Sequence, residues 1–170
     1  MASKTEEEMK KIGDSHPLGD LLDRWAESVA KEDKGELTIE YDEDEDVFRV
    51  SRDGRAAVVF TSEIDEDFYG EPEAIFVESE IGVPPENLDL SQTLKFSGNE
   101  LVLSRISLAD RDSKTLLLVE AAIPTSTVQT NTFDLMVKEV ATIARDLRKH
   151  LAQVLITDES DEEDEDDEEE

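Results

Sequence analysis

Apolar residues recur at helical spacing near the start of the chain. Between residues 14 and 35 they step by three and four positions, which is typical of an amphipathic helix with one buried face. Ser15 is a candidate N-cap for this helix, and Gly35 would allow a left-handed stop. The segment therefore predicts a helix whose apolar face consists of Leu18, Leu21, Leu22, Trp25 and Val29.

The middle of the chain changes to a period of two, which is typical of half-buried strands. Residues 36–41, 47–52, 55–62, 74–83 and 114–124 are the clearest strands, and the last is apolar on both faces, as a central strand would be. Asp53-Gly54 predicts a type I′ hairpin, and Ser97-Gly98-Asn99 indicates a second hairpin within 93–108. Residues 42–46 and 65–73 are polar connections.

A second and longer helix is predicted over 126–155. Its apolar residues step 4-3-4-3-4-3 and consist of Phe133, Val137, Val140, Ala144, Leu147, Leu151 and Val154. Such a stripe suits either a two-stranded coiled coil or a helix lying across a sheet. We favour the second arrangement, because Ala144 and the short length are weak features for an independent zipper.

The order of elements predicts an α+β domain, with an antiparallel sheet flanked by an N-terminal helix and a long C-terminal helix. We expect a flexible N-terminus over 1–13, a single domain over 14–156 and a disordered acidic tail over 157–170.

Charge narrows the classes of partner. The 170 residues include 46 acidic and 17 basic residues, for a net charge of −29, and twelve of the acids follow Ile156. A field of this sign repels nucleic acid and anionic membranes and favours basic partners. The acidity would also fit a salt-adapted source. No apolar run is long enough to span a bilayer, and the first residues lack the apolar core of a secretory signal, so we expect a cytoplasmic protein.

Candidate catalytic and ligand-binding residues are few. There is no cysteine, and neither His16 nor His150 has an evident local partner. The acidic stretch 42–46 resembles a calcium loop in composition but lacks the spacing of an EF-hand. No phosphate-binding loop is present. We therefore expect no enzyme activity, no cofactor and no specific metal site.

Protein–protein contact is the remaining class of function. We assign Val137, Ala144, Leu147 and Leu151 to helix packing or to a partner or dimer surface, with an exposure that the sequence does not fix. The tail could screen Arg145, Arg148 and Lys149 until a basic partner displaces it, or it could simply promote solubility. Aromatic residues such as Phe68 and Tyr69 are candidate loop anchors or interface residues.

From about Asn87 to Leu151 the pattern resembles a known family. The segments "LKFSGNELVLSRISL", "LLLVEAAIP" and "FDLMVKEVATIARDLRKHL", preceded by the helix "LGDLLDRWAE", are similar to the YbjN-like family and to the wider class of type III secretion chaperone-like proteins. The resemblance implies a small acidic α+β domain, commonly a homodimer, that binds extended segments of a client protein. It implies no catalytic residue.

Two hypotheses of function follow. The first is a non-enzymatic protein-binding module that takes segments of a client protein along an apolar groove. The alternative is an acidic chaperone or mimic that captures basic proteins electrostatically through its tail and loops. Salt separates them, because only electrostatic capture weakens steeply as ionic strength rises.

Overall fold

A single antiparallel sheet organises the computed structural model, which describes residues 16–31, 36–86, 88–89, 91, 93, 101–111 and 113–161, with side chains to 152. Its six strands lie in the order β1-β2-β3-β4-β6-β5. Their bounds are Leu37–Asp42 for β1, Val47–Arg52 for β2, Arg55–Glu63 for β3, Glu73–Gly82 for β4, Arg105–Arg111 for β5 and Lys114–Pro124 for β6. The predicted α+β class is confirmed.

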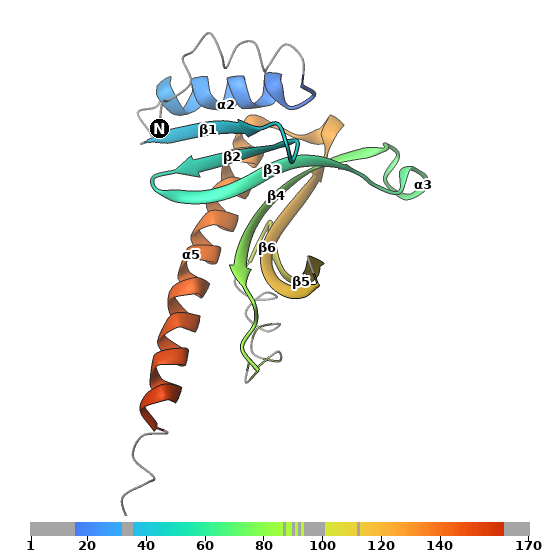
Figure 1. Ribbon diagram of the computed structural model, residues 1–170. Coiled ribbons are helices and arrows are strands. Elements are labelled where there is room, and N and C mark those ends of the chain that lie inside the picture. Colours follow the sequence, from blue (N-terminus) through green and yellow to red (C-terminus); the bar gives the residue numbers. More distant parts are fainter. Residues whose placement is uncertain are drawn as a thin grey trace, which may run out of the picture.

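Two helices cover one face of this sheet (Figure 1). Helix α2 spans Gly19–Lys31 and helix α5 spans Thr130–Asp161, while α3 (Glu66–Tyr69) and the 3-10 turn η1 (Thr125–Thr127) are short. The apolar stripe of α5 packs on β3, β4 and β6, so the helix lies across the sheet and the coiled-coil alternative is wrong for the described residues.

The core forms where α2, α5 and the sheet meet. Trp25 of α2 and Phe133 of α5 are fully buried and meet edge to face, with ring centroids 5.1 Å apart. Val59 and Val77 come from the sheet and are also fully buried. Truncating an aromatic side chain in such a core costs about 3–5 kcal/mol, so this contact contributes substantially to the attachment of α2.

The predicted Asp53-Gly54 hairpin is confirmed. Both residues have positive φ, at 51° and 72°, which is the geometry of a type I′ turn, and the turn joins β2 to β3. The predicted hairpin at Ser97-Gly98-Asn99 lies outside the described residues. Farther along the chain, β5 and β6 form a hairpin in which Arg111 pairs with Lys114 and Ser113 lies in the turn with φ 64°.

Helix α2 begins at Gly19, three residues later than a cap at Ser15 would place its start. Ser15 lies outside the described residues, and the His16 ring takes part in the first turn, because its Nδ1 accepts the Leu18 N–H at 3.1 Å. The helix α5 runs to Asp161 and so includes the first five residues of the predicted tail.

Candidate functional site

The face of the sheet that carries no helix forms a groove, which we call the open-face groove. Its volume is about 760 Å³. It crosses β1, β2, β3, β4 and β6, with Arg111 of β5 and Arg148 of α5 at its margin. Four strand intervals of about 4.8 Å give a width of roughly 19 Å, about the length of six residues of extended chain.

Apolar side chains form the floor of the groove. Ala56, Val58 and Phe60 project from β3, and Leu116 projects from β6. Phe60 stacks on Phe76 of β4, with ring centroids 5.5 Å apart and planes 10° apart, and the two residues are paired across the strands. A hydrophobic strip thus runs along β3 on the side away from the helices, where a half-buried strand would normally present polar residues.

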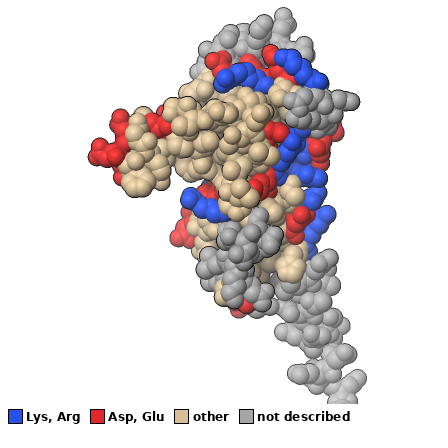
Figure 2. Space-filling model, turned by 180° about the vertical axis from the view of Figure 1, so that it is seen from behind, with Lys and Arg blue, Asp and Glu red and all other residues tan. Residues whose placement is uncertain are grey.

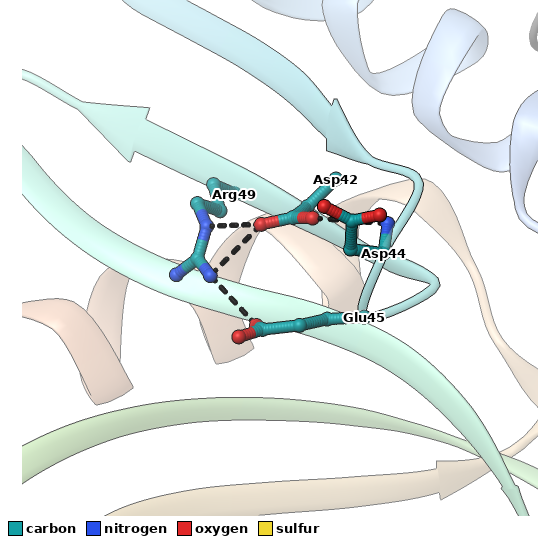
Figure 3. A network of polar contacts seen from close by, with 4 residues as sticks. All are labelled: Asp42, Asp44, Glu45 and Arg49. Carbon is teal, nitrogen blue, oxygen red and sulfur yellow. Dashed lines mark hydrogen bonds and ion pairs between the residues drawn. The ribbon is translucent and has the colours of Figure 1, made fainter.

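The first charged rim lies at the turn between β1 and β2 (Figure 3). Arg49 donates from Nε and Nη2 to Asp42, at 3.2 and 3.0 Å, and from Nη2 to Glu45 at 2.7 Å. The hydrogen bond from Arg49 is the main reason that the pKa of Asp42 lies below its ordinary value. Asp42 and Glu45, two of the five carboxylates in the stretch 42–46, are therefore bound to an arginine of the same chain.

The second charged rim lies across the groove. Arg111 pairs with the buried Glu78 at 2.7 Å, and Arg148 donates to the hydroxyl of Ser79 at 2.9 Å and to the carbonyl of Glu80. The groove thus combines an apolar floor with rims at which Arg49 and Arg111 are paired with carboxylates, while Glu40 and Glu80 also line it. This arrangement suits the mixed polar and apolar surface of a polypeptide more than a single strongly charged ligand.

Catalytic and metal-binding features are sparse in the part of the chain that the structure describes. No group of three or more His, Asp or Glu residues there could hold a metal ion. His16 packs edge to face on Phe48, and its Nε2 lies 3.4 Å from Asp46, so the ring is a packing element at the helix start. No helix among the described residues is long and apolar enough to cross a membrane.

The four residues assigned to a helix surface divide into two pairs. Val137 and Ala144 are fully buried against the sheet, so they pack the core and offer no surface to a partner. Leu147 and Leu151 are half-buried farther along α5, where a contact with a partner stays a prediction.

The three basic residues that we expect the tail to screen differ in their contacts. Arg145 pairs with Asp146 at 2.8 Å, and Arg148 is bound to β4. Lys149 is exposed. Screening by the tail stays a proposal for all three bases, of which Arg145 already has a carboxylate partner and Arg148 donates to neutral acceptors.

The open-face groove was not predicted from the sequence. The signal is the run Ala56–Phe60, in which both faces of β3 are apolar although only one face is covered by helices. Arg111 and Arg148 could not be placed at its margin, because their positions depend on the β5–β6 pairing and on the path of α5.

Comparison with known proteins adds two solved structures. Neither the protein-family models nor the curated proteins include a match. The type III secretion chaperone SycH of Yersinia pestis, crystallised in complex with a stable fragment of YscM2, aligns at 17% identity and a TM-score of 0.48, over 75% of this chain and 97% of that one. YbjN from E. coli, described as a candidate transcription regulator, aligns at 16% identity and a TM-score of 0.49, over 79% and 91%.

SycH is a type III secretion chaperone, and YbjN is the protein after which the YbjN-like family is named. The structural neighbours are therefore the ones that the resemblance in sequence predicts. At these identities and TM-scores, the function of the chain has to be inferred from its own surfaces.

Proposed function

We propose that the protein is a non-enzymatic protein-binding module that holds an extended segment of a client polypeptide in the open-face groove. The single observation that carries the proposal is the apolar strip of Ala56, Val58, Phe60 and Leu116 on the helix-free face of the sheet.

The dimensions of the groove support a polypeptide as the occupant. A width of roughly 19 Å suits about six residues of extended chain. Every second side chain of such a segment would point to the apolar floor, and the two ends of the segment would lie at the rims. The rims hold Arg49 and Arg111 beside carboxylates, so they can exchange hydrogen bonds with the backbone of the segment without an unpaired charge being buried.

The binding of a YscM2 fragment by SycH is consistent with this proposal, although the proposal rests on the groove of this chain. A homodimer and a cytoplasmic location are further expectations that belong with it.

The alternative, electrostatic capture of basic proteins, is favoured by a separate observation. The chain carries 46 acids against 17 bases, and its acidic residues are not confined to the C-terminal run. This second mode would act over distance and would disappear at high salt, when the screening length falls from about 8 Å to about 3 Å at 1 M.

A peptide selection on the full chain tests the proposal. Twelve-residue peptides are selected from a random display library in 1 M NaCl, which suppresses electrostatic capture, and their affinities are then measured by fluorescence anisotropy. Val58→Lys places a charged side chain on the apolar floor, so we expect it to weaken the selected peptides at least about tenfold, or 1.4 kcal/mol.

Val83→Lys provides the matched control, because Val83 is an exposed valine outside the residues that line the groove. We expect it to bind the selected peptides as the unmodified chain does. Peptides that bind Val58→Lys with undiminished affinity, or a failure to select any peptide, would refute the proposal.

A further inference from the structure

A second surface lies on the connection between β3 and β4, residues 63–73, which we call the aromatic arm. It projects from the body of the molecule and carries α3 at its tip (Figure 1). Phe68 and Tyr69 lie in α3, with 78% and 55% of their surfaces exposed. Their rings contact each other edge to face, with centroids 4.8 Å apart.

The arm is held in one conformation by several hydrogen bonds. The Ile64 N–H donates to the Pro72 carbonyl at 2.8 Å, and the Asp65 carboxylate accepts the Phe68 N–H at 3.2 Å. Gly70 ends α3 with φ 78°, which is favourable for glycine. The exposed rings are thus presented by an ordered turn, so that a partner would lose little conformational freedom of the arm on binding.

A second set of bonds ties the arm to the body. Glu71 accepts the N–H and the hydroxyl of Ser126, both at 2.8 Å, and the Thr125 hydroxyl donates to the Glu73 carbonyl at 2.9 Å. The direction in which the aromatic pair points is therefore fixed relative to the sheet.

The arm is strongly acidic. No lysine or arginine occurs between Arg55 and Lys95, and six carboxylates lie on the arm itself. None of the six forms an ion pair with another residue in the described part of the chain. Figure 2 shows the arm with red and tan atoms only, while most of the Lys and Arg atoms in that view lie on the opposite side. The six carboxylates are Glu63, Asp65, Glu66, Asp67, Glu71 and Glu73.

We propose that the aromatic arm docks a basic segment of another polypeptide, in which an arginine or lysine stands beside an apolar side chain. The apolar side chain covers the rings of Phe68 and Tyr69, and the cation lies against a ring face and the neighbouring carboxylates. A second copy of this chain is a poor occupant of the arm itself, because the six carboxylates of the arm would meet a chain with 46 acidic and 17 basic residues. The inference rests on the proposed function and adds to it the chemistry of the partner.

Three labelled dodecapeptides test the arm on the full chain. They are four repeats of Arg-Leu-Gly, of Arg-Ser-Gly and of Glu-Leu-Gly, compared by fluorescence anisotropy at 0.15 M salt. We expect Arg-Leu-Gly to bind most tightly, Arg-Ser-Gly about tenfold more weakly, and Glu-Leu-Gly not to bind. Equal binding of the first two peptides would overturn the proposal, because charge alone would then explain it.

Variants then locate the binding. The double variant Phe68→Ser/Tyr69→Ser should weaken Arg-Leu-Gly about tenfold, whereas Leu135→Ser, which removes an equally exposed apolar side chain from α5, should leave the affinity unchanged. The melting temperature of the double variant should stay within about 2 °C of the original, since both rings are exposed. Unchanged affinity in the double variant would refute the proposal. The proposed function of the open-face groove would still stand after such a result, provided that the selected peptides bound Val58→Lys more weakly than the original chain.

Discussion

Asp134 connects three elements of the fold through one side chain. Its carboxylate accepts the indole N–H of Trp25 in α2 at 3.0 Å and pairs with Lys138 in α5, and it lies 3.8 Å from Nε of the buried Arg52 in β2. Two nitrogens of Arg52 have no hydrogen-bond partner in the structure, so Asp134 supplies the nearby negative charge that makes a buried guanidinium tolerable.

Replacing this charge should destabilise the fold. We expect Asp134→Asn to lower the free energy of unfolding by about 1–3 kcal/mol, because Arg52 and Lys138 lose their counter-charge while the size of the side chain is kept. Urea denaturation followed by circular dichroism measures the change. Asp146→Asn is the control, because Asp146 is exposed and its pairing with Arg145 should contribute less than about 1 kcal/mol. A smaller loss for Asp134→Asn than for the control would contradict the assigned role.

The same group predicts how stability depends on pH. Burial alone raises the pKa of Asp134, but hydrogen bonds from Lys138 and Trp25 and the charges of Lys138 and Arg52 outweigh it, and the pKa lies below its ordinary value. A lowered pKa in the folded state gives stability that is present above the unfolded value of about 3.9 and is lost as the pH falls through the folded value.

Urea titrations between pH 7 and pH 2.5 test this dependence. The difference in unfolding free energy between the original chain and Asp134→Asn should be constant above about pH 5 and should narrow below about pH 4. Subtracting the two chains removes most of the change caused by the other carboxylates. A difference that stays constant down to pH 2.5 would show that the ionised carboxylate contributes nothing.

Individual residues were predictable where a local rule determines them. The positive φ of Asp53 and Gly54 follows from the preference of a type I′ turn and needs no tertiary information. The role of Asp134 was not predictable, because Trp25 lies 109 positions earlier in the chain. The part played by His16 in the first turn of α2 also depends on its packing against Phe48.

At the scale of elements, one glutamate of α5 binds the backbone of the three residues that precede β5. A single carboxylate oxygen of Glu139 in α5 accepts the backbone N–H groups of Val102, Leu103 and Ser104 at 3.1, 3.0 and 2.8 Å, and also the Ser104 hydroxyl at 2.7 Å. Burial would raise the pKa of Glu139, but these hydrogen bonds lower it below its ordinary value. The segment before β5 is thus fixed to α5 by a side chain.

Weakening this attachment should loosen the segment locally. Glu139→Gln replaces the charged acceptor with a neutral one, which forms weaker hydrogen bonds, so we expect faster amide exchange at Val102, Leu103 and Ser104. Hydrogen–deuterium exchange measured by NMR reports these amides, and the amides of β2, which Glu139 does not contact, provide the internal control. Exchange that speeds up equally in both regions would indicate global destabilisation instead.

Elements whose apolar residues recur at a regular spacing were predicted well. Features that depend on pairing between distant segments were not. The 114–124 strand and the stripe of α5 follow directly from the apolar spacing. The β5–β6 hairpin was not predicted, because Asp112-Ser113 between its strands is a weaker turn signal than Asp-Gly or Asn-Gly, and the hairpin expected at Ser97-Gly98-Asn99 stays a prediction. The floor of the groove was missed, because an apolar run on a strand does not reveal which face the helices cover.

At the scale of the whole molecule, the acidic residues are divided between a folded body and a C-terminal run. If the tail screens Arg145, Arg148 and Lys149, removing residues 158–170 should strengthen binding of an acidic peptide and weaken binding of a basic one. The net charge would fall in magnitude by twelve, and both changes should shrink in 1 M salt.

Fluorescence anisotropy compares these affinities. A Glu-rich and an Arg-rich peptide are each titrated with the full chain and with residues 1–157. No change in either affinity would eliminate the screening role and leave a tail that only promotes solubility.

The central claim is that the helix-free face of the sheet binds a polypeptide segment. The most direct measurement is an NMR titration of the full chain in 1 M NaCl with a peptide selected under the same conditions. We predict that the largest shifts fall on Val58, Phe60 and Leu116, with small shifts on the exposed face of α5 around Leu135. Shifts confined to α5 or to the aromatic arm, with none on β3, would contradict the account.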